Sequence, residues 1–358
     1  MRLASIFFHS STVSRRPPMT SPLHSLPPIR WPAEAIWEAV APDLPGFTVE
    51  VLPEIDSTNS ELMRRFKGAP GRPPQPEPLL LVAEQQSAGR GRLGRSWQSR
   101  RGDSLMFSLG LPLAPADWSG LSLAVGISVA DSLDPLDAGQ ARHAARPRIG
   151  LKWPNDLWLS TPEGERKLGG ILVETASGDG LRYLVIGVGI NIRPVPLADL
   201  PLTGAAPVPP GGLQTLDAGM DAPGALLRIV PALVQAVQAF AQFGFEPFQA
   251  RFAARDVLAN RAVQLTDGTQ GTAYGVADNG ALRVHTAGGM VEVTSAEVSV
   301  RPVAPPSVGA RRHAEDAGPG AAAGQCAVLR LGPGPAGGLW PGACAAVRTR
   351  TAGAADPA

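Results

Sequence analysis

Two long apolar runs near the middle of the 358-residue chain constrain its fold most strongly. One is Lys-Leu-Gly-Gly-Ile-Leu-Val-Glu at 167–174, and the other is Tyr-Leu-Val-Ile-Gly-Val-Gly-Ile-Asn at 183–191. The turn residues Ser-Gly-Asp-Gly lie between them at 177–180. Nearly continuous apolar runs of this length are typical of strands that are buried on both faces. The two runs therefore predict a hairpin of buried strands.

Shorter patterns predict further elements on either side of this hairpin. Strands are predicted at 48–52, 79–85, 103–111 and 148–159. Helices are predicted at 31–40, 121–133 and 226–243, and another helix begins at Ser57 or Thr58, with Glu61 near the capping-box position. We expect the strand at 148–159 to bend at Pro154, because proline removes a backbone donor. Pro231 is expected near the start of the last helix.

The pattern changes after residue 261, where short apolar strands alternate with Asp-Gly, Asn-Gly and Gly-Gly turns. Several hairpins in so short a stretch predict a small barrel. The two ends of the chain lack a pattern that could pack, so we expect both to be disordered, with Met19 as an alternative start. The expected division is an extension at 1–28, a main domain at 29–255, a barrel at 256–303 and a tail at 304–358.

Composition excludes several classes of protein. Charged residues make up 18% of the chain and the formal net charge is +1, so no overall basic character points to nucleic acid as a partner. Cys326 and Cys344 both lie in the tail, which excludes a disulfide framework or a cysteine-ligated metal in the globular part and suits a reducing compartment. The apolar patch at 3–8 is too short for a secretory signal or a membrane span. We therefore expect a cytoplasmic protein without a membrane partner.

A loop at 89–95 reads Gly-Arg-Gly-Arg-Leu-Gly-Arg and follows the apolar run at 79–83. Alternating glycine and arginine joins a backbone that can approach a ligand closely to fixed positive charge, which suits a phosphate or a carboxylate. The spacing also matches a dinucleotide-binding loop. Such a loop must open a helix, whereas this one leads into another predicted strand. An arginine-rich surface hairpin without a ligand is the structural alternative.

Five motifs in a fixed order carry a resemblance to a known family. They are Asp-Ser-Thr-Asn at 56–59, Gln86 with Gly-Arg-Gly-Arg at 89–92 and Arg95-x-Trp97, Lys-Trp-Pro-Asn-Asp at 152–156, and the apolar runs at 167–174 and 187–191. Together they closely resemble the biotin protein ligases, and the hairpin at 278–282 looks like that family's C-terminal domain. The resemblance implies an α+β fold. Its core is a mixed sheet like that of class II aminoacyl-tRNA synthetases, with helices on one side, followed by an SH3-like barrel.

The resemblance also implies an ATP-dependent ligase that works in two steps. The carboxylate of biotin attacks the α-phosphate of ATP to give biotinyl-5'-AMP. A lysine of a biotin carboxyl carrier domain, in acetyl-CoA carboxylase or a related carboxylase, then attacks this mixed anhydride. Because the first step brings two anions together, cations are needed where charge accumulates. Mg²⁺ would arrive with ATP, near Asn191, without a dedicated protein site.

The resemblance assigns roles to particular residues. Lys152 would bridge the biotin carboxylate and the α-phosphate, and Arg92 would close over the intermediate, so these two are the expected catalytic residues. The expected biotin-binding residues are Ser57, Thr58, Asn59, Gln86, Arg90, Gly91, Arg92, Lys152, Gly170 and Gly189. Neutral donors and acceptors suit the uncharged ureido ring, and close strand packing is the alternative role of the glycines. The expected nucleotide-binding residues are Arg95, Trp97, Asn155, Asn191 and Arg301.

Two departures from the family pattern bear on function. Many members have a further arginine where Leu93 stands, so the loop carries less charge here. Members that repress transcription carry an N-terminal winged-helix domain, and the proline-rich residues before the first motif are too few for one. We therefore expect no nucleic-acid binding, and the oligomeric state stays open, with a homodimer among the alternatives. Lipoate or octanoate ligases and transferases of the same fold, and a non-catalytic biotin-binding regulator, are the rival functions.

Overall fold

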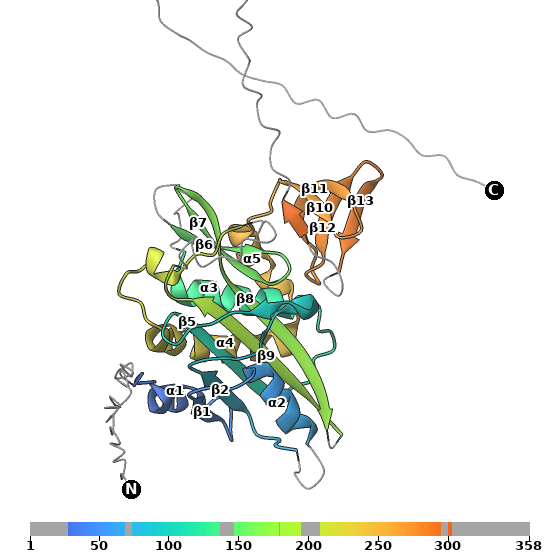
Figure 1. Cartoon of the computed structure of the whole chain (residues 1–358). Helices are drawn as coiled ribbons and strands as arrows, with labels where there is room; N and C mark the ends of the chain where they lie inside the picture. Colours follow the sequence, from blue (N-terminus) through green and yellow to red (C-terminus); the bar gives the residue numbers. More distant parts are fainter. Residues whose placement is uncertain are drawn as a thin grey trace, which may run out of the picture. The chain divides into compact units, whose positions relative to one another are not determined.

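The structure is a computed structural model that describes residues 28–68, 74–136, 147–178, 180–194, 208–294 and 300–302. All of these residues belong to one compact unit, Met1–Pro306. It contains a seven-stranded sheet with its helices and, later in the chain, a five-stranded sheet (Figure 1). The tail predicted at 304–358, with both cysteines, lies outside the described residues, as does the extension at 1–28 apart from Pro28.

The large sheet is mixed, as the resemblance implied. Its strands lie in the order β1-β2-β5-β9-β8-β7-β6. β1 and β2 pair in parallel, and every other neighbouring pair is antiparallel. The bounds are β1 Thr48–Leu52, β2 Leu79–Ala83, β5 Ser104–Pro112, β6 Arg148–Lys152, β7 Asp156–Thr161, β8 Gly164–Gly178 and β9 Leu181–Asn191.

The predicted hairpin of buried strands is confirmed by β8 and β9. They pair from Gly169 with Ile190 to Gly178 with Leu181, and β9 pairs on its other side with β5. Strands with neighbours on both edges and cover on both faces need apolar side chains almost throughout, which explains the unbroken runs. β8 begins earlier than the apolar run, at Gly164, because its polar first residues pair with β7.

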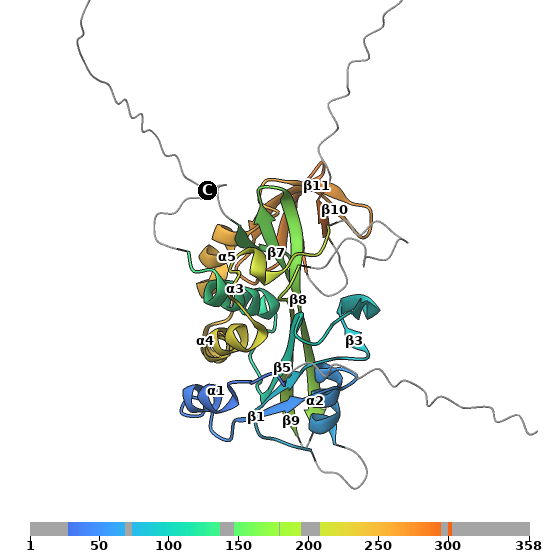
Figure 2. The ribbon, with the colours of Figure 1, turned by 60° about the vertical axis from the view of Figure 1, so that its left-hand side comes forward.

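Alternating side chains divide the core into two parts, one on each face of the sheet. Leu80 and Val82 of β2 pack in the main cluster with α1, α3 and α4, whereas Leu79 and Leu81 pack with α2. Figure 2 shows α2 on the side of the sheet opposite the other helices. The helices are α1 Ala33–Val40, α2 Thr58–Lys67, α3 Leu121–Leu133, α4 Ala222–Phe243 and α5 Gln249–Arg255.

The expectation of helices on one side therefore holds for α1, α3 and α4 but not for α2. Leu62 and Phe66 give α2 an apolar stripe, and the Phe66 ring stacks on Tyr183 of β9 with 4.6 Å between the centroids. This stripe covers one part of the second face. The rest of that face is left for the pocket described below.

α4 starts earlier than predicted, and its proline has another position. The side chain of Asp221 caps the helix by accepting a hydrogen bond from the Gly224 amide at 2.8 Å, so the helix begins at Ala222. Pro231 consequently lies inside the helix rather than near its start. By length and composition alone α4 could span a membrane, but its apolar face is buried against α1, α3 and β5, as in a core helix.

The predicted C-terminal hairpins are confirmed by an antiparallel sheet in the order β13-β12-β11-β10-β14. Gly280 occupies the predicted Asn-Gly turn with a φ of 79°, a conformation that glycine adopts at low cost. The indole of Trp153 donates to the Gly280 carbonyl at 3.0 Å, which ties this turn to the large sheet. The strands are β10 Ala262–Leu265, β11 Gln270–Val276, β12 Leu282–Thr286, β13 Gly289–Val293 and β14 Val300–Pro302.

Three local features differ from the predictions. The strand at 148–159 is a hairpin of two strands, β6 and β7, with a turn that contains the cis Trp153–Pro154 bond. The loop at 89–97 is itself a short hairpin, in which β3 Gly89–Arg90 pairs with β4 Ser96–Trp97 around a 3₁₀ turn. The helix α5 was not predicted. The 3₁₀ segments are η1 Arg92–Gly94, η3 Leu213–Thr215 and η4 Glu246–Phe248.

Candidate functional site

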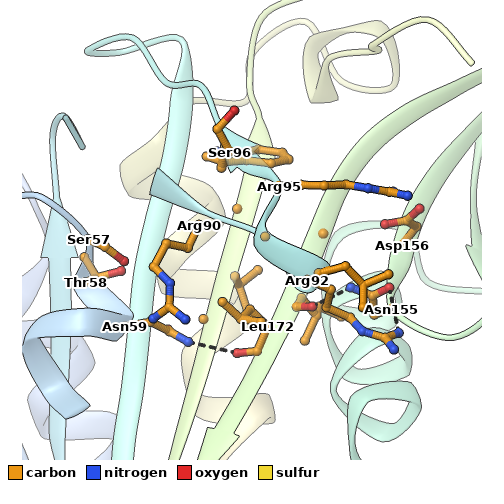
Figure 3. Close-up of a pocket in the computed structure, with 18 of the residues that line it drawn as sticks. Ser57, Thr58, Asn59, Arg90, Arg92, Arg95, Ser96, Asn155, Asp156 and Leu172 are labelled. Atoms are coloured by element: carbon orange, nitrogen blue, oxygen red, sulfur yellow. Dashed lines mark hydrogen bonds between the residues drawn. The ribbon is translucent and has the colours of Figure 1, made fainter. Parts of the chain in front are cut away.

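A hollow of about 970 Å³, which includes its solvent-filled mouth, lies under the β3–β4 hairpin on the face of the sheet that carries α2. β8 and β9 form its floor, and the hairpin covers it (Figure 3). The start of α2 closes one end, and the turn between β6 and β7 closes the other. A single pocket therefore collects residues from the motifs at 56–59, 86–97, 152–156, 167–174 and 187–191.

The structure brings most of the expected site residues into this pocket. Those that line it are Ser57, Thr58, Asn59, Gln86, Arg90, Gly91, Arg92, Arg95, Trp97, Lys152, Asn155, Gly170 and Gly189. Asn191 instead lines a neighbouring hollow on the other side of β4, together with Arg100 and Arg193, and Trp97 lines both hollows. Arg301 lies in β14 opposite Gln264, and its side chain is outside the described part of the chain.

One end of the pocket is built from uncharged side chains, and we call it the neutral end: Ser57, Thr58, Asn59, Gln86 and Ser108. Ser57 caps α2, since its hydroxyl accepts from the Ser60 amide at 3.4 Å. Glu61 does not complete a capping box, because its carboxylate binds Arg64 and Arg65. The Thr58 amide donates to Gln86 Oε1 at 2.7 Å. Gln86, which lies next to the hairpin, thus accepts from one of the backbone amides that have no partner within the first turn of α2.

Asn59 is the most constrained residue of the neutral end. Its Nδ2 donates to the Leu172 carbonyl at 3.1 Å and to Glu174 Oε2 at 3.0 Å. The Ser108 hydroxyl, fully buried in β5, lies 2.6 Å from Asn59 Oδ1 and 2.7 Å from Thr58 Oγ1. Gly187 leaves the room that the Asn59 amide needs, because a Cβ at that position would overlap it. The neutral end is thus held in place by its own hydrogen bonds.

The opposite end, which we call the cationic end, contains Lys152, Lys167, Arg92 and Arg95 around Asp156. Lys152 ends β6 and its side chain is only 9% exposed. Its Nζ lies 3.9 Å from Asp156 Oδ2, too far for a hydrogen bond, and 5.7 Å from the centroid of Trp158. Burial lowers the pKa of Lys152 to about 8, against the attraction of Asp156 and with the help of repulsion from the other cations.

The two hairpin arginines also point to this end. Figure 3 shows Arg92 beside Asn155 and Arg95 directed toward Asp156. Arg92 Nη1 lies 3.4 Å from Asn155 Oδ1, and burial lowers the pKa of Arg92 from its ordinary value. The Asn155 amide nitrogen donates to the Ile171 carbonyl at 2.7 Å, which fixes the side chain. Several cations in one partly buried place favour an anionic ligand.

Arg90 does not share this arrangement. Its guanidinium donates to Glu174 Oε1 at 2.8 Å, on the neutral side of the pocket. Leu93, where the resemblance implied an arginine in many members, lies at the hairpin tip with 57% exposure and a φ of 55°. Of the residues in the hairpin, Arg92 and Arg95 are therefore those that contribute positive charge to the cationic end.

The floor glycines differ in what they leave room for. A Cβ on Gly189 would lie 2.8 Å from the indole of Trp97, so here Trp97 fills the space above Gly189. A Cβ on Gly170 would lie 3.8 Å from Asp156 Oδ1 and 4.0 Å from Lys167 Nζ. Gly170 thus belongs to the cationic end rather than to the place expected for a flat ring. The Trp97 Nε1 is buried without a hydrogen-bond partner among the described residues.

Four residues whose side-chain contacts shape the site, namely Asp156, Lys167, Glu174 and Ser108, were not expected from the sequence. Asp156 and Lys167 form an ion pair of 2.7 Å, and both belong to motifs that were recognised, as does Glu174. Their charges beside named site residues were an available signal. Ser108 carried no such signal, because it is a single serine inside an apolar strand and only the pairing of β5 with β9 brings it under Asn59.

No cluster of three or more histidine, cysteine or acidic residues that could hold a metal ion occurs in the described ranges. Within the cationic end, Asp156 is the single carboxylate, and Lys167 already binds it. The pocket therefore combines a pre-ordered uncharged end with an end that has an excess of positive charge. This arrangement suits a ligand with a neutral polar head and an anionic group at the other end.

Comparisons with known proteins agree with this geometry. The sequence profile of the Biotin/lipoate A/B protein ligase family matches residues 52–191, and the profile of the Biotin protein ligase C terminal domain matches residues 259–301. The first match contains every described residue of the pocket, and the second contains most of the five-stranded sheet.

Relatives and solved structures extend the similarity beyond these profiles. The bifunctional ligase/repressor BirA of Escherichia coli (strain K12) is 35% identical over 266 residues, which cover 72% of this chain and 75% of BirA. A biotin acetyl-CoA-carboxylase ligase of Paracoccus denitrificans is 30% identical over 253 residues, which cover 69% of this chain and 98% of that protein. The structure of a biotin protein ligase from Aquifex aeolicus in complex with biotin and ATP has a TM-score of 0.55 and 26% identity, covering 71% of this chain and 99% of that chain. The chain belongs to the biotin protein ligase family.

Proposed function

We propose that the chain is an ATP-dependent biotin protein ligase that activates biotin as biotinyl-5'-AMP and transfers it to a lysine of a carboxylase. The observation that carries this proposal is the buried Lys152 at the cationic end of a pocket whose other end is uncharged. Biotin has an uncharged ureido ring and a carboxylate on a flexible chain. Its two polar groups therefore correspond to the two ends of the pocket.

In the first step the ring binds at the neutral end, and the carboxylate lies beside Lys152. A carboxylate oxygen attacks the α-phosphorus of ATP, the bond to the β-phosphate oxygen breaks, and pyrophosphate leaves. Two anions meet in this step, so the cation of Lys152 stabilises the transition state more than the separated reactants. Arg92 and Arg95 add charge on the hairpin side of the same place.

We assign the nucleotide to the cationic end and the neighbouring hollow. Arg95 and Asn155 would contact the phosphates from the cationic end, and Asn191, in the neighbouring hollow that Trp97 also lines, would lie on the ATP and metal side. Arg301 remains a proposed contact, since its side chain is not described. Mg²⁺ would enter bound to ATP phosphates near Asn191, where it neutralises phosphate charge, because the lone carboxylate of Asp156 already binds Lys167.

In the second step the acceptor is proposed to be a biotin carboxyl carrier domain of acetyl-CoA carboxylase or a related carboxylase. The neutral amine of its lysine attacks the acyl carbon of biotinyl-5'-AMP, the bond to the phosphate oxygen breaks, and AMP leaves. An amide to biotin is formed and the amine's proton is released. The relative from Paracoccus denitrificans is named for this acceptor, which supports the assignment.

The remaining partner assignments are proposals as well. We propose a cytoplasmic enzyme that binds neither DNA nor membrane, supported by the net charge of +1 and by α1, which carries Glu34 and Glu38 and no basic residue. A homodimer is the oligomeric alternative to test, by light scattering with and without biotin and ATP. A shift of biotin-operon promoter DNA at nanomolar protein and physiological salt would contradict the absence of DNA binding.

Incubation with ATP, Mg²⁺, biotin and a biotin carrier domain, followed by the intact mass of that domain, tests the function. The expected result is the mass increase of one biotinyl group, together with pyrophosphate release. Lipoate in place of biotin should give neither product at equal concentration. Ligation of lipoate in preference to biotin would assign the chain to the lipoate branch of the fold, and tight biotin binding without pyrophosphate would make it a regulator.

A further inference from the structure

Glu174 joins the covering hairpin to the floor and to the neutral end of the pocket. It lies in β8, and its carboxylate accepts from Arg90 Nη2 at 2.8 Å and Nη1 at 3.3 Å. The same carboxylate accepts from Asn59 Nδ2 at 3.0 Å. Arg90 Nη1 also lies 3.2 Å from the hydroxyl of Ser60 in α2. The Glu174 side chain thus contacts both the β3–β4 hairpin, which we call the lid, and Asn59 of the neutral end.

The charges around the hairpin favour this single anchoring point. The described residues that line the outer hollow of the hairpin are Ala88 to Ser96, Leu172 and Glu174, and among these Glu174 is the only acidic residue. Of the three hairpin arginines, Arg92 and Arg95 face the cationic end (Figure 3). Arg90 faces the neutral side instead and pairs there with the Glu174 carboxylate of β8. The sheet therefore holds the neutral side of the lid through one charge-assisted contact.

Asn59 gives this contact a connection to ligand binding. Both amide hydrogens of Asn59 are used, one by Leu172 and one by Glu174, and its carbonyl oxygen accepts from Ser108. Asn59 is therefore ordered before a ligand binds, and it holds the Glu174 carboxylate in the position that Arg90 contacts. Because Glu174 is 21% exposed and Arg90 46% exposed, solvent competes for their pair in the empty pocket, and a ring packed against Asn59 reduces this competition.

We propose that Glu174 is a positioning residue that couples ring binding at Asn59 to closure of the β3–β4 hairpin, and that it thereby retains biotinyl-5'-AMP until the acceptor arrives. The inference rests on the proposed function. It assigns Glu174 no contact with the reacting atoms. Its effect is expected on the release of the intermediate rather than on its formation, since adenylation takes place at the cationic end.

The test compares Glu174→Gln with wild type in the full chain. The variant keeps the shape of the side chain but loses its charge, so we expect release of biotinyl-5'-AMP to rise about threefold to tenfold, the effect of one partly exposed charge-assisted contact. Release is measured as biotin on added albumin at equal adenylation, which pyrophosphate reports. Biotin should also protect the hairpin arginines from trypsin in wild type and less so in the variant.

Glu50→Gln is the matched control, because Glu50 forms a carboxylate–guanidinium pair with Arg65 away from the pocket. It should label albumin as wild type does. Arg90→Gln removes the other half of the proposed contact, and the double variant should release the intermediate no faster than either single variant. This second variant also decides the question should Glu174→Gln not fold.

Two results would overturn the coupling. One is wild-type retention in Glu174→Gln or, if that variant does not fold, in Arg90→Gln. The other is a double variant whose release is the product of the two single effects. Failure of the proposed function is distinguishable from both, because wild type would then give no biotin-dependent pyrophosphate at all.

Discussion

The two ends of the pocket have opposite electrostatic and hydrogen-bonding characters. At the neutral end, the Ser108 hydroxyl forms hydrogen bonds with Thr58 and Asn59 at 2.7 and 2.6 Å. The network extends from Thr58 to Gln86 and from Asn59 to Glu174. At the cationic end, four cations surround one carboxylate, and the pKa of Lys152 falls to about 8. One end is complete without a ligand, whereas the other is short of negative charge.

The difference teaches how the pocket divides binding from catalysis. A network whose members are already satisfied is rigid and selects a ligand by shape and hydrogen-bond pattern. At the cationic end, mutual repulsion and burial raise the free energy of the cations. An anionic ligand lowers it again, and most strongly where negative charge accumulates during adenylation. Changes at the cationic end should therefore alter rate, and changes at the neutral end should alter affinity.

Both ends are carried by the same two strands. β8 presents Lys167 and Gly170 to the cationic end, and Leu172 and Glu174 accept hydrogen bonds from Asn59 of the neutral end. The rigid hairpin with β9 fixes the distance between the two ends. A ligand that reaches both must match this distance, which adds selectivity for chain length between ring and carboxylate.

The largest effect is expected from Lys152→Gln. It removes the charge between two anions, so the rate of biotinyl-5'-AMP formation should fall by several powers of ten, where each tenfold is about 1.4 kcal/mol of barrier. Single-turnover pyrophosphate release measures it. The melting temperature should stay equal or rise, because a buried ammonium is removed.

Lys167→Gln is the matched control for Lys152, since Lys167 is a half-buried lysine of the same end that is paired with Asp156 at 2.7 Å. Its loss of rate should be at least tenfold smaller than that of Lys152→Gln. Equal losses in the two variants would mean that the total charge of this end, rather than the position of Lys152, governs the first step.

The next effect is expected from Arg92→Gly, which removes the hairpin's buried charge at the cationic end. The intermediate is a reactive mixed anhydride that needs a closed lid, so the variant should lose retention more than adenylation, and release of biotinyl-5'-AMP should rise about tenfold or more. The measurement is biotin on albumin against biotin on the carrier domain at equal adenylation. Unlabelled albumin, despite formation of the intermediate, would show that the hairpin is not the lid.

A smaller effect, on affinity, is expected from Ser108→Ala at the neutral end. Removing the hydroxyl takes the donor away from Asn59 Oδ1, whereas Thr58 Oγ1 keeps its bond to Gln86 Oε1. Asn59 is then held less firmly, and the loss of one such hydrogen bond, about 0.5–1.5 kcal/mol, sets an upper bound of about 2- to 10-fold on the loss of biotin affinity. The adenylation rate at saturating biotin should change little. Calorimetric titration gives the affinity, and a main loss in saturated rate would break the proposed division between the two ends.

The smallest effect is a pH dependence. The pKa of Lys152 is lowered in the folded protein from 10.5 to about 8, so its positive charge is present below pH 8 and is lost as the pH rises through that value. Burial is the main cause of the lowered pKa of Lys152; the attraction of Asp156 opposes it, and the nearby charges of Lys167, Arg95 and Arg92 add to it.

The kcat/KM of adenylation for biotin should consequently fall severalfold between pH 7.5 and pH 9. Lys152→Arg keeps its charge throughout, so its own profile, whatever its absolute rate, should be flat over this interval. A fall of equal size in Lys152→Arg would assign the titration to another group. The free energy of unfolding changes in the opposite direction to activity. Below pH 8 the folded state bears the cost of burying the ammonium, and this cost decreases as the pH rises above 8.

Much of the fold and the site was available from the sequence. The runs at 167–174 and 183–191 predicted a buried hairpin because strands paired on both edges and covered on both faces need apolar residues almost throughout. α3 has the predicted bounds, Leu121–Leu133, and the Asn-Gly turn before β12 was recognisable from turn chemistry alone. Thirteen of the residues expected from the family motifs line one pocket.

Tertiary structure decided what no local pattern contains. Which face of the sheet α2 covers follows from the pairing of β2, β5 and β9, and the same pairing brings Ser108 beneath Asn59. Asn191 lies in the neighbouring hollow because the β3–β4 hairpin divides the surface, although it is the last residue of the floor strand β9.

The charged residues show most clearly what the sequence leaves undetermined. The sequence alone determined that lysines and arginines occur in the right motifs, since residue identity fixes the kind of group that is present. Only the folded chain assigned Arg90 to Glu174, left Lys152 3.9 Å from Asp156, and buried it enough to lower its pKa to about 8. Burial and distance between groups far apart in sequence set electrostatic energies, and both are properties of the tertiary structure.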